Sequence, residues 1–360
     1  MQFLFNVEQQ MLRESMAAMV EPWQLNVEVT EAQASRPLLW DALVNSGMTG
    51  VCVPTTNGGS GLGLVEAGCI LEALGTILDN GNFLMSALLS AYLLSRSRKD
   101  SLNSDWLTSL ASGQTKATVL LSHALDGTFT VDDRRIELTC GPTIGTSDAD
   151  ILLLVVRTAG QNSPTLLIFP TDTPEFKFQP LPVPDSTRAV YTITCRTLPL
   201  EAATACLALP EDAAQILRPL AVAAQSVQML GGAAEVFSQA CQYARERVQF
   251  GKPIGRFQAI KHLLADDRVM LDGLRSLSYA ALWQLNAGAS EGPATAYAAK
   301  IWAAEVYTRL SSDAIQVHGA MGIAAESRPH LYLKRSIVDR TIFGSPPFYI
   351  DALHALNIDL

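Results

Sequence analysis

The densest group of cationic side chains lies between residues 243 and 262, in the stretch YARERVQFGKPIGRFQAIKH. It contains Arg245, Arg247, Lys252 and Arg256. Guanidinium groups bind phosphates with paired hydrogen bonds, so a cluster of this kind can hold a phosphorylated ligand. Taken alone, the cluster is also typical of a solvated helix end that complements the helix dipole.

Cysteine and histidine, the usual metal ligands, show no metal-binding spacing. The 6 cysteines include no C-x-x-C pair, and the 5 histidines do not stand beside them at ligand spacing. Zinc sites and disulfide frameworks depend on such spacing. We therefore predict no metal site and interpret the cysteines as small buried hydrophobic residues.

The cationic stretch must be positioned by helices on either side of it. Apolar residues at helical spacing begin after Glu211, and Gly251 and Pro253 are expected to end that long helix. Two more helices are predicted at about Phe257–Ala287 and Pro293–Val317. Long antiparallel helices with short connections form a bundle, so we predict a C-terminal four-helix bundle at residues 211–360.

Two further regions precede this bundle. Apolar residues recur at helical spacing up to about residue 113, and the glycine-rich stretch 54–63 is interpreted as an interhelix loop. The middle region contains short β-rich runs, at Arg135–Cys140, Ile151–Thr158, Thr165–Phe169, Phe176–Gln179 and Val190–Thr197. We therefore predict an α+β protein with an N-terminal helical domain at 1–115 and an antiparallel β-barrel or sandwich at 116–210.

The composition limits the kind of partner. Charged residues make up 17% of the chain, below the roughly 25% typical of soluble proteins, so we expect part of the surface to be covered by a partner. The net charge of −9 disfavours nucleic acid and anionic lipid as ligands. No apolar run approaches the roughly 20 residues of a membrane span, and no basic leader is seen, so a cytoplasmic location is expected.

Three segments together resemble the acyl-CoA dehydrogenase family. Residues 244–262 are similar to its signature A-x-x-R-x-x-F-G-x-P-I-x-x-F-Q-x-x-x-H. Residues 313–323, DAIQVHGAMGI, resemble its Q-x-x-G-G-x-G segment, with alanine in place of the second glycine. Residues 185–188, DSTR, resemble its D-x-T-R turn. The order of helical, β and helical regions also agrees, so the resemblance covers essentially the whole chain.

This resemblance implies an FAD-dependent oxidation of an acyl-CoA thioester to its trans-2-enoyl form, in which a carboxylate removes the Cα proton and the flavin accepts hydride from Cβ. It also implies that FAD is bound at a subunit interface. The FAD-binding residues carried over are Arg247 at the pyrophosphate, Gln249, Phe250 and Gln258 beside it, and Gln316, Gly319 and Ala320 at the adenosine half of a neighbouring subunit's FAD.

Several family features are missing. The catalytic Glu usually stands in a Y-E-G-T loop, but residues 340–348, RTIFGSPPF, contain no carboxylate, and neither do residues 220–222 at the alternative position. The T-E-P-x-x-G-S-D and W-I-T-N segments around the flavin are not retained at 120–127 and 142–146. The catalytic residue of this chain is therefore unknown, and His123 is interpreted as structural.

The leading hypothesis is the base-lacking subunit of a heteromeric α2β2 acyl-CoA dehydrogenase, similar to those of bacterial steroid catabolism. A longer paralogue would supply the catalytic Glu, the substrate would be a bulky steroid-type acyl-CoA, and electron-transfer flavoprotein would accept the electrons. Two alternatives remain. One is a homomeric enzyme that uses Asp339, Asp351 or Glu326 as a relocated base, and the other is a structural subunit without flavin.

Overall fold

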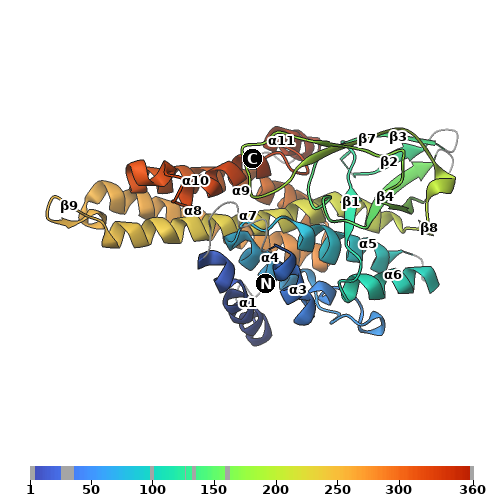
Figure 1. The fold of residues 1–360 in the computed structure, drawn as a ribbon, viewed down its shortest axis with the longest axis horizontal. Coiled ribbons are helices and arrows are strands. Elements are labelled where there is room, and N and C mark those ends of the chain that lie inside the picture. The colour runs from blue at the N-terminus through green and yellow to red at the C-terminus, as the bar shows by residue number, and fades with distance from the viewer. Residues whose placement is uncertain are drawn as a thin grey trace.

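The computed structural model describes most of the 360-residue chain, namely residues 5–25, 36–97, 101–125, 127–131, 135–158 and 163–356. Helices come first, strands follow, and long helices complete the chain, which confirms the predicted fold class. Figure 1 shows the long helices running along the molecule, with the strands of the middle region gathered at one end. The division at residues 115 and 210 stays a prediction, and both positions fall in connections between elements.

The N-terminal region is helical. Its elements are α1 (Val7–Leu25), α3 (Arg36–Asn45), the turns η1 (Met48–Gly50) and η2 (Thr55–Asn57), α4 (Leu64–Thr76), the π-helical η3 (Phe83–Ser90), α5 (Ala91–Arg96) and α6 (Ser101–Ala111). In the glycine-rich stretch, the backbone N–H groups of residues 60–62 donate to carbonyl oxygens of residues 50–53 at 2.8–2.9 Å. Because these donors already have partners within the chain, the stretch is an interhelix loop and not a phosphate cradle.

Two sheets make up the middle region. Its strands are β1 (Ala117–Leu120), β2 (Phe129–Val131), β3 (Arg135–Thr143), β4 (Ile151–Thr158), β5 (Thr165–Pro170), β6 (Lys177–Pro180), β7 (Tyr191–Pro199) and β8 (Ala205–Ala208), with the turn η4 (Leu200–Ala202) before β8. One sheet has the order β1-β4-β5-β8 with β2 also on β4, and the other has the order β3-β7-β6. Apolar side chains from both sheets form one buried cluster between them, so the region is a sandwich.

The expected antiparallel pairing is wrong for part of the first sheet. β1 and β2 both pair parallel with β4, whereas β5 and β8 and the whole second sheet are antiparallel. Antiparallel neighbours are often joined by a short turn that the sequence displays. Parallel neighbours are joined by longer connections, so the local turn signals that led to the prediction could not reveal them.

Long helices form the C-terminal region. They are α7 (Glu211–Glu246), α8 (Gln258–Asn286), α9 (Gly292–His318), α10 (Pro329–Asp339) and α11 (Pro346–Ala355), with the short elements β9 (Val248–Gln249), β10 (Lys252–Pro253), η5 (Ile254–Arg256) and η6 (Gly319–Ile323). α10 packs on α7 and α9 as the fourth member of the predicted bundle. Among the described helices, α7 alone is long and apolar enough to cross a membrane, but 83% of its apolar stretch is buried, as in a core helix.

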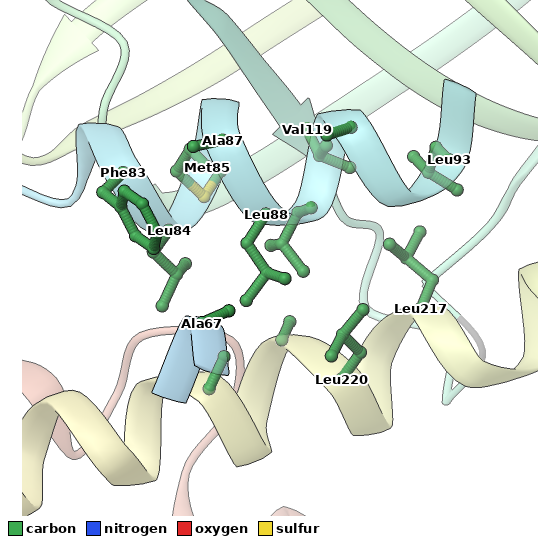
Figure 2. Packing of buried hydrophobic residues seen from close by; sticks show 14 of the residues in the cluster. Ala67, Phe83, Leu84, Met85, Ala87, Leu88, Leu93, Val119, Leu217 and Leu220 are labelled. Carbon is green, nitrogen blue, oxygen red and sulfur yellow. The ribbon is translucent and has the colours of Figure 1, made fainter. Parts of the chain in front are cut away.

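The N-terminal half of α7 is fixed by packing on two other regions. Figure 2 shows η3 lying across α7, with Leu88 directed toward the helix that carries Leu217 and Leu220 and with Val119 of β1 beside η3. All four side chains are at most 1% exposed. Burying a leucine side chain contributes about 1.5–3 kcal/mol relative to leaving it in water. This packing holds the intervening residue, Arg218, at a fixed place between the β region and the C-terminal loops.

Candidate functional site

The cationic stretch forms a small hairpin between α7 and α8. α7 ends at Glu246, a few residues before the position predicted from Gly251 and Pro253. β9 and β10 then pair antiparallel, with Lys252 opposite Gln249. Gly251 turns the hairpin at φ +76°, a conformation that favours glycine because it has no Cβ.

Arg247 lies at the base of this hairpin as the residue that caps α7, with φ −70° and ψ 117°. Its side chain is exposed and forms no hydrogen bond or ion pair with the other residues that the structure describes. A guanidinium held in this way keeps all five N–H donors available for an anionic ligand.

The second predicted segment lies against the same hairpin. Gln316 stands in the last turn of α9, and Gly319 caps that helix at φ 59° and ψ −137°. A Cβ at Gly319 would meet nothing within 4 Å, so the backbone here faces open space. A cavity of about 310 Å³ joins the two segments and is lined by Tyr243, Arg247, Gln249, Ile254, Gln316, Val317, His318, Gly319, Ala320 and Met321.

Five of the seven predicted FAD-binding residues therefore line one cavity, here called the elbow cavity. The other two, Phe250 and Gln258, do not line it. Phe250 is 90% exposed at the tip of the hairpin, where φ is +53° and its ring packs edge-on against Phe257. Gln258 is the exposed first residue of α8.

Sequence reasoning missed the aromatic wall of the elbow cavity. The His318 ring stacks on the Tyr243 ring, with their centroids 4.3 Å apart, and His318 Nδ1 lies 2.7 Å from the carbonyl oxygen of Ala314. Burial lowers the pKa of His318 below its usual value, so the ring is neutral at pH 7. The two residues are 75 positions apart in the sequence, and no local pattern joins them.

A second cavity, of about 260 Å³, lies where the β region meets α7 and the loop before α11. We call it the loop cavity. It is lined by Val119, Leu121, Ser122, His123, Cys140, Gly141, Pro142, Thr143, Arg218, Thr341, Phe343, Gly344, Ser345 and Phe348. Many of these residues belong to segments 120–127, 142–146 and 340–348. The family's flavin loop, W-I-T-N motif and Y-E-G-T loop are expected in these segments and are not retained there. Within the described chain, no carboxylate lines this cavity.

The charged group in the loop cavity is a cation. Arg218 is 3% exposed, and its Nε donates to the carbonyl oxygen of Ala124 at 3.1 Å. Its Nη2 donates to the carbonyl of Ser122, and its Nη1 donates to the carbonyl of Phe343 and to the Tyr349 hydroxyl. Arg218 thus ties the loop after β1 to the loop before α11.

None of the three carboxylates considered as a relocated base lines the loop cavity. Asp339 is 2% exposed and accepts a hydrogen bond from Arg188 at 2.6 Å, while Asp351 and Glu326 are exposed. His123 does line the cavity, on an exposed turn. The geometry therefore supports no proton-abstracting carboxylate among the described residues.

The D-x-T-R segment is part of a buried ionic network. Arg188 pairs with Asp339, and Arg335 of α10 pairs with Asp185, all four side chains being at most 3% exposed. Both guanidinium groups also donate to the backbone carbonyl of Asp79, at 3.0 and 2.8 Å. This network joins the β region, the C-terminal helices and the N-terminal region, and its role is structural.

The two cavities lie far apart on one helix. Arg218 and Arg247 are 29 residues apart, and at 1.5 Å per residue α7 separates them by about 43 Å. Figure 1 agrees, with β9 at one tip of the molecule and the strands at the other end. A single bound ligand of ordinary cofactor size cannot contact both arginines of the same chain.

Comparisons with known proteins identify the family. Residues 6–114 match the family model "Acyl-CoA dehydrogenase, N-terminal domain", and residues 216–347 match "Acyl-CoA dehydrogenase, C-terminal domain". The acyl-CoA dehydrogenase IpdE2 of Mycolicibacterium smegmatis is 28% identical over 353 residues, covering 97% of this chain and 98% of the relative.

Two solved structures share the whole fold. The ChsE4-ChsE5 complex from Mycobacterium tuberculosis contains a chain with a TM-score of 0.86 and 23% identity, matched over 99% of this chain and 98% of that one. The Tcur3481-Tcur3483 steroid ACAD, in its G363A variant, gives a TM-score of 0.85 and 23% identity over 97% of both chains. With two family models matched over about two-thirds of its residues, the chain belongs to the acyl-CoA dehydrogenase family of FAD-dependent oxidoreductases.

Proposed function

We propose that this chain is the subunit of a heteromeric acyl-CoA dehydrogenase that completes the FAD site of a longer paralogue. One observation carries the proposal: the elbow cavity presents an exposed Arg247 with no partner among the described residues, whereas the loop cavity holds a buried Arg218 and no described carboxylate. The chain is thus equipped to hold a phosphorylated cofactor at one end, and at the other end its described residues supply no carboxylate base.

The separation of the cavities supports a role in a neighbour's site. About 43 Å of helix lies between Arg218 and Arg247, so the elbow cannot reach a ligand in the loop cavity of its own chain. An elbow that projects from the tip of the molecule can instead enter a site on an adjacent subunit. In a complex with a paralogue, that adjacent site is the one that contains the catalytic Glu.

The residues of the elbow cavity suit the parts of FAD that the family resemblance assigns to them. Arg247 would bind the pyrophosphate through charge-assisted hydrogen bonds, with Gln249 beside it. Gln316, Gly319 and Ala320 would meet the adenosine half, where the open space beside Gly319 lets the backbone approach closely. When bound, FAD supplies the hydride acceptor for the oxidation. Phe250 and Gln258 do not line the cavity and remain proposed contacts of FAD.

The chemistry of the loop cavity supports a partner that supplies the base. Removal of the Cα proton requires a carboxylate in a dry pocket beside the substrate. The loop cavity instead holds the cation Arg218, which cannot accept the Cα proton. None of Asp339, Asp351 and Glu326 lines this cavity. The homomeric alternative with a relocated base therefore has no support from the geometry.

The substrate class and the electron acceptor are inferred from relatives. Because the similar Tcur3481-Tcur3483 protein is a steroid ACAD, we propose a bulky steroid-type acyl-CoA as the substrate of the complex. The similar ChsE4-ChsE5 structure is a complex of two proteins, which supports a heteromer of the α2β2 kind. Electron-transfer flavoprotein is the proposed acceptor, as the family resemblance implies.

Replacing Arg247 by glutamine tests the half-site. In the complex coexpressed with the longer paralogue, Arg247→Gln should leave assembly intact and weaken FAD binding by about ten- to a hundred-fold, because it removes the charge-assisted bonds to the pyrophosphate. FAD content is read from flavin absorbance after gel filtration.

The matched control is Arg268→Gln, which changes an exposed arginine of α8 that lines neither cavity and should retain FAD. Unchanged FAD affinity in Arg247→Gln would favour the alternative of a structural subunit. An FAD-loaded, active assembly made of this chain alone would contradict the proposal outright.

A further inference from the structure

The charge of Arg218 is not balanced by any carboxylate in the part of the chain that the structure describes. Its acceptors are the carbonyl oxygens of Ser122, Ala124 and Phe343 and the hydroxyl of Tyr349, all of them neutral. Phe348 adds a neutral aromatic face, with its centroid 5.4 Å from the guanidinium carbon. Buried charges in proteins are normally paired, because leaving water costs free energy that dipoles replace only in part.

Arg218 also keeps one donor for a ligand. A guanidinium has five N–H groups, and among the described residues Nε and Nη2 each have one acceptor, while the acceptors of Nη1 are the Phe343 carbonyl and the Tyr349 hydroxyl. The second N–H of Nη2 has no acceptor in that part of the chain. Because Arg218 lines the loop cavity, this cavity combines a net positive charge with an available hydrogen-bond donor.

The remaining walls of the loop cavity limit what could bind there. Leu121, Pro142, Phe343 and Phe348 supply apolar surface, and Ser345 supplies a hydroxyl. Ligand sites typically combine such apolar walls with a few polar groups that fix orientation. The volume of about 260 Å³ admits a small organic molecule and excludes a whole coenzyme A thioester.

We propose that the loop cavity is a binding site for a small monocarboxylate. Its carboxylate would accept a hydrogen bond from Nη2 of Arg218 and balance the guanidinium charge, while its hydrocarbon part would lie against the apolar walls. Inorganic phosphate fits less well, because it carries more negative charge than one guanidinium balances and has no apolar part for these walls. The site is independent of the elbow cavity, so it stands even if the proposed FAD function fails.

Benzoate and benzamide test this site on the unmutated chain, purified in whatever assembly it forms. The two molecules share a shape and differ in charge, so titration calorimetry compares the contribution of the anion directly. Benzoate should bind tighter than benzamide by about ten-fold or more, because a charged pair in a desolvated cavity is strong. Equal affinities, or no binding of benzoate, would overturn the proposal without any mutation.

Variants then locate the site. Arg218→Gln should abolish the preference for benzoate, and Arg247→Gln, which changes the arginine of the other cavity, should preserve it. A preference lost in Arg247→Gln and kept in Arg218→Gln would place the anion at the elbow and overturn the proposal. If Arg218→Gln does not fold, as judged by circular dichroism, the comparison in the unmutated chain still decides.

Asp126 provides a further check, since it follows Ala124 by two positions and lies outside the described residues. Asp126→Asn should leave the benzoate affinity unchanged. Binding that appears only in Asp126→Asn would mean that the chain supplies its own counter-ion to Arg218, and the proposal would then be wrong.

Discussion

At the scale of single residues, Arg218 of α7 and Arg247, which caps the same helix, have opposite surroundings. Arg247 is exposed and has no partner among the described residues, whereas Arg218 is buried and bound to neutral oxygens of two loops. The first arrangement suits reversible binding of an anionic cofactor. The second arrangement ties Arg218 to the two loops of the loop cavity. A positive charge therefore lies where the family resemblance would place a catalytic carboxylate.

Lys300 is a buried cation that joins the ionic network through the backbone of Asp339. It is 0% exposed, and its Nζ donates to Gln225 Oε1 at 2.6 Å and to the backbone carbonyl of Asp339. Burial lowers the pKa of Lys300 to about 7, an effect that the carboxylate of Asp339 opposes and the guanidinium of Arg188 reinforces. Folding is therefore linked to the protonation of this amine.

The sign of this linkage predicts greater stability at alkaline pH. Between about pH 7 and the ordinary lysine value of 10.5, the unfolded chain binds a proton that the folded chain does not, so stability rises with pH. From about pH 6.5 to about pH 8.5 the unmutated protein should gain about 2 kcal/mol more than Lys300→Met, which lacks the titrating group. Urea unfolding across this range measures the difference.

Lys177→Met is the matched control, because Lys177 is exposed on β6. Its loss should not change how the free energy of unfolding depends on pH. Identical slopes for the unmutated protein and Lys300→Met would show that Lys300 does not titrate in this window.

The sequence predicted the elbow residues because they are contiguous and carry a long signature. Arg247 and Gln249 stand in one such string, and Gln316 to Ala320 stand in another. The role of Arg218 was not predicted, because its partners Ser122 and Phe343 are distant in the sequence and come close to it only in the folded chain. A signal was present, because Arg218 is the one charged residue between Asp212 and Glu235.

At the scale of elements, α4 and α7 cross at unusually close range. A Cβ on Gly231 of α7 would lie 1.9 Å from the carbonyl oxygen of Glu72, and one on Gly75 of α4 would lie 2.0 Å from that of Gln228. Real side chains do not tolerate such distances. The two glycines therefore permit the contact through which the N-terminal region is held against the bundle.

Gly231→Ala should lower the free energy of unfolding by about 3 kcal/mol, because the added methyl group must push the two helix backbones apart. Gly273→Ala is the control, since a Cβ there meets only Trp302 Nε1 at 3.7 Å, and it should raise stability by about 0.5–1 kcal/mol as alanine favours a helix. Thermal or urea unfolding measures both. A neutral Gly231→Ala would mean that the helices can separate freely at this crossing.

Element types were predicted better than pairings. The two later long helices were placed to within one residue, at Gln258–Asn286 and Gly292–His318, since their apolar spacing continues over many turns. The strands β1, β2 and β8 were not predicted individually, because runs of at most 4 residues show a period only weakly, although β6, which is equally short, was predicted.

At the scale of the whole molecule, the shortage of charged residues has a visible counterpart. Large apolar side chains remain exposed at the elbow and beside it, among them Val248, Phe250, Met321 and Ile323, with exposures of 52–90%. Val248 and Phe250 belong to the hairpin, and Met321 and Ile323 belong to η6, the two segments that contribute residues to the elbow cavity. A surface of this kind at the tip of the molecule matches the covered interface expected from the composition.

The FAD content of the purified complex tests the central claim most directly. If this chain donates its elbow to a paralogue and its own loop cavity holds Arg218 in place of a base, the complex should contain half as many FAD molecules as chains. Flavin absorbance against the protein concentration of each subunit measures this ratio. One FAD for every chain, or an active FAD-loaded assembly of this chain alone, would contradict the account.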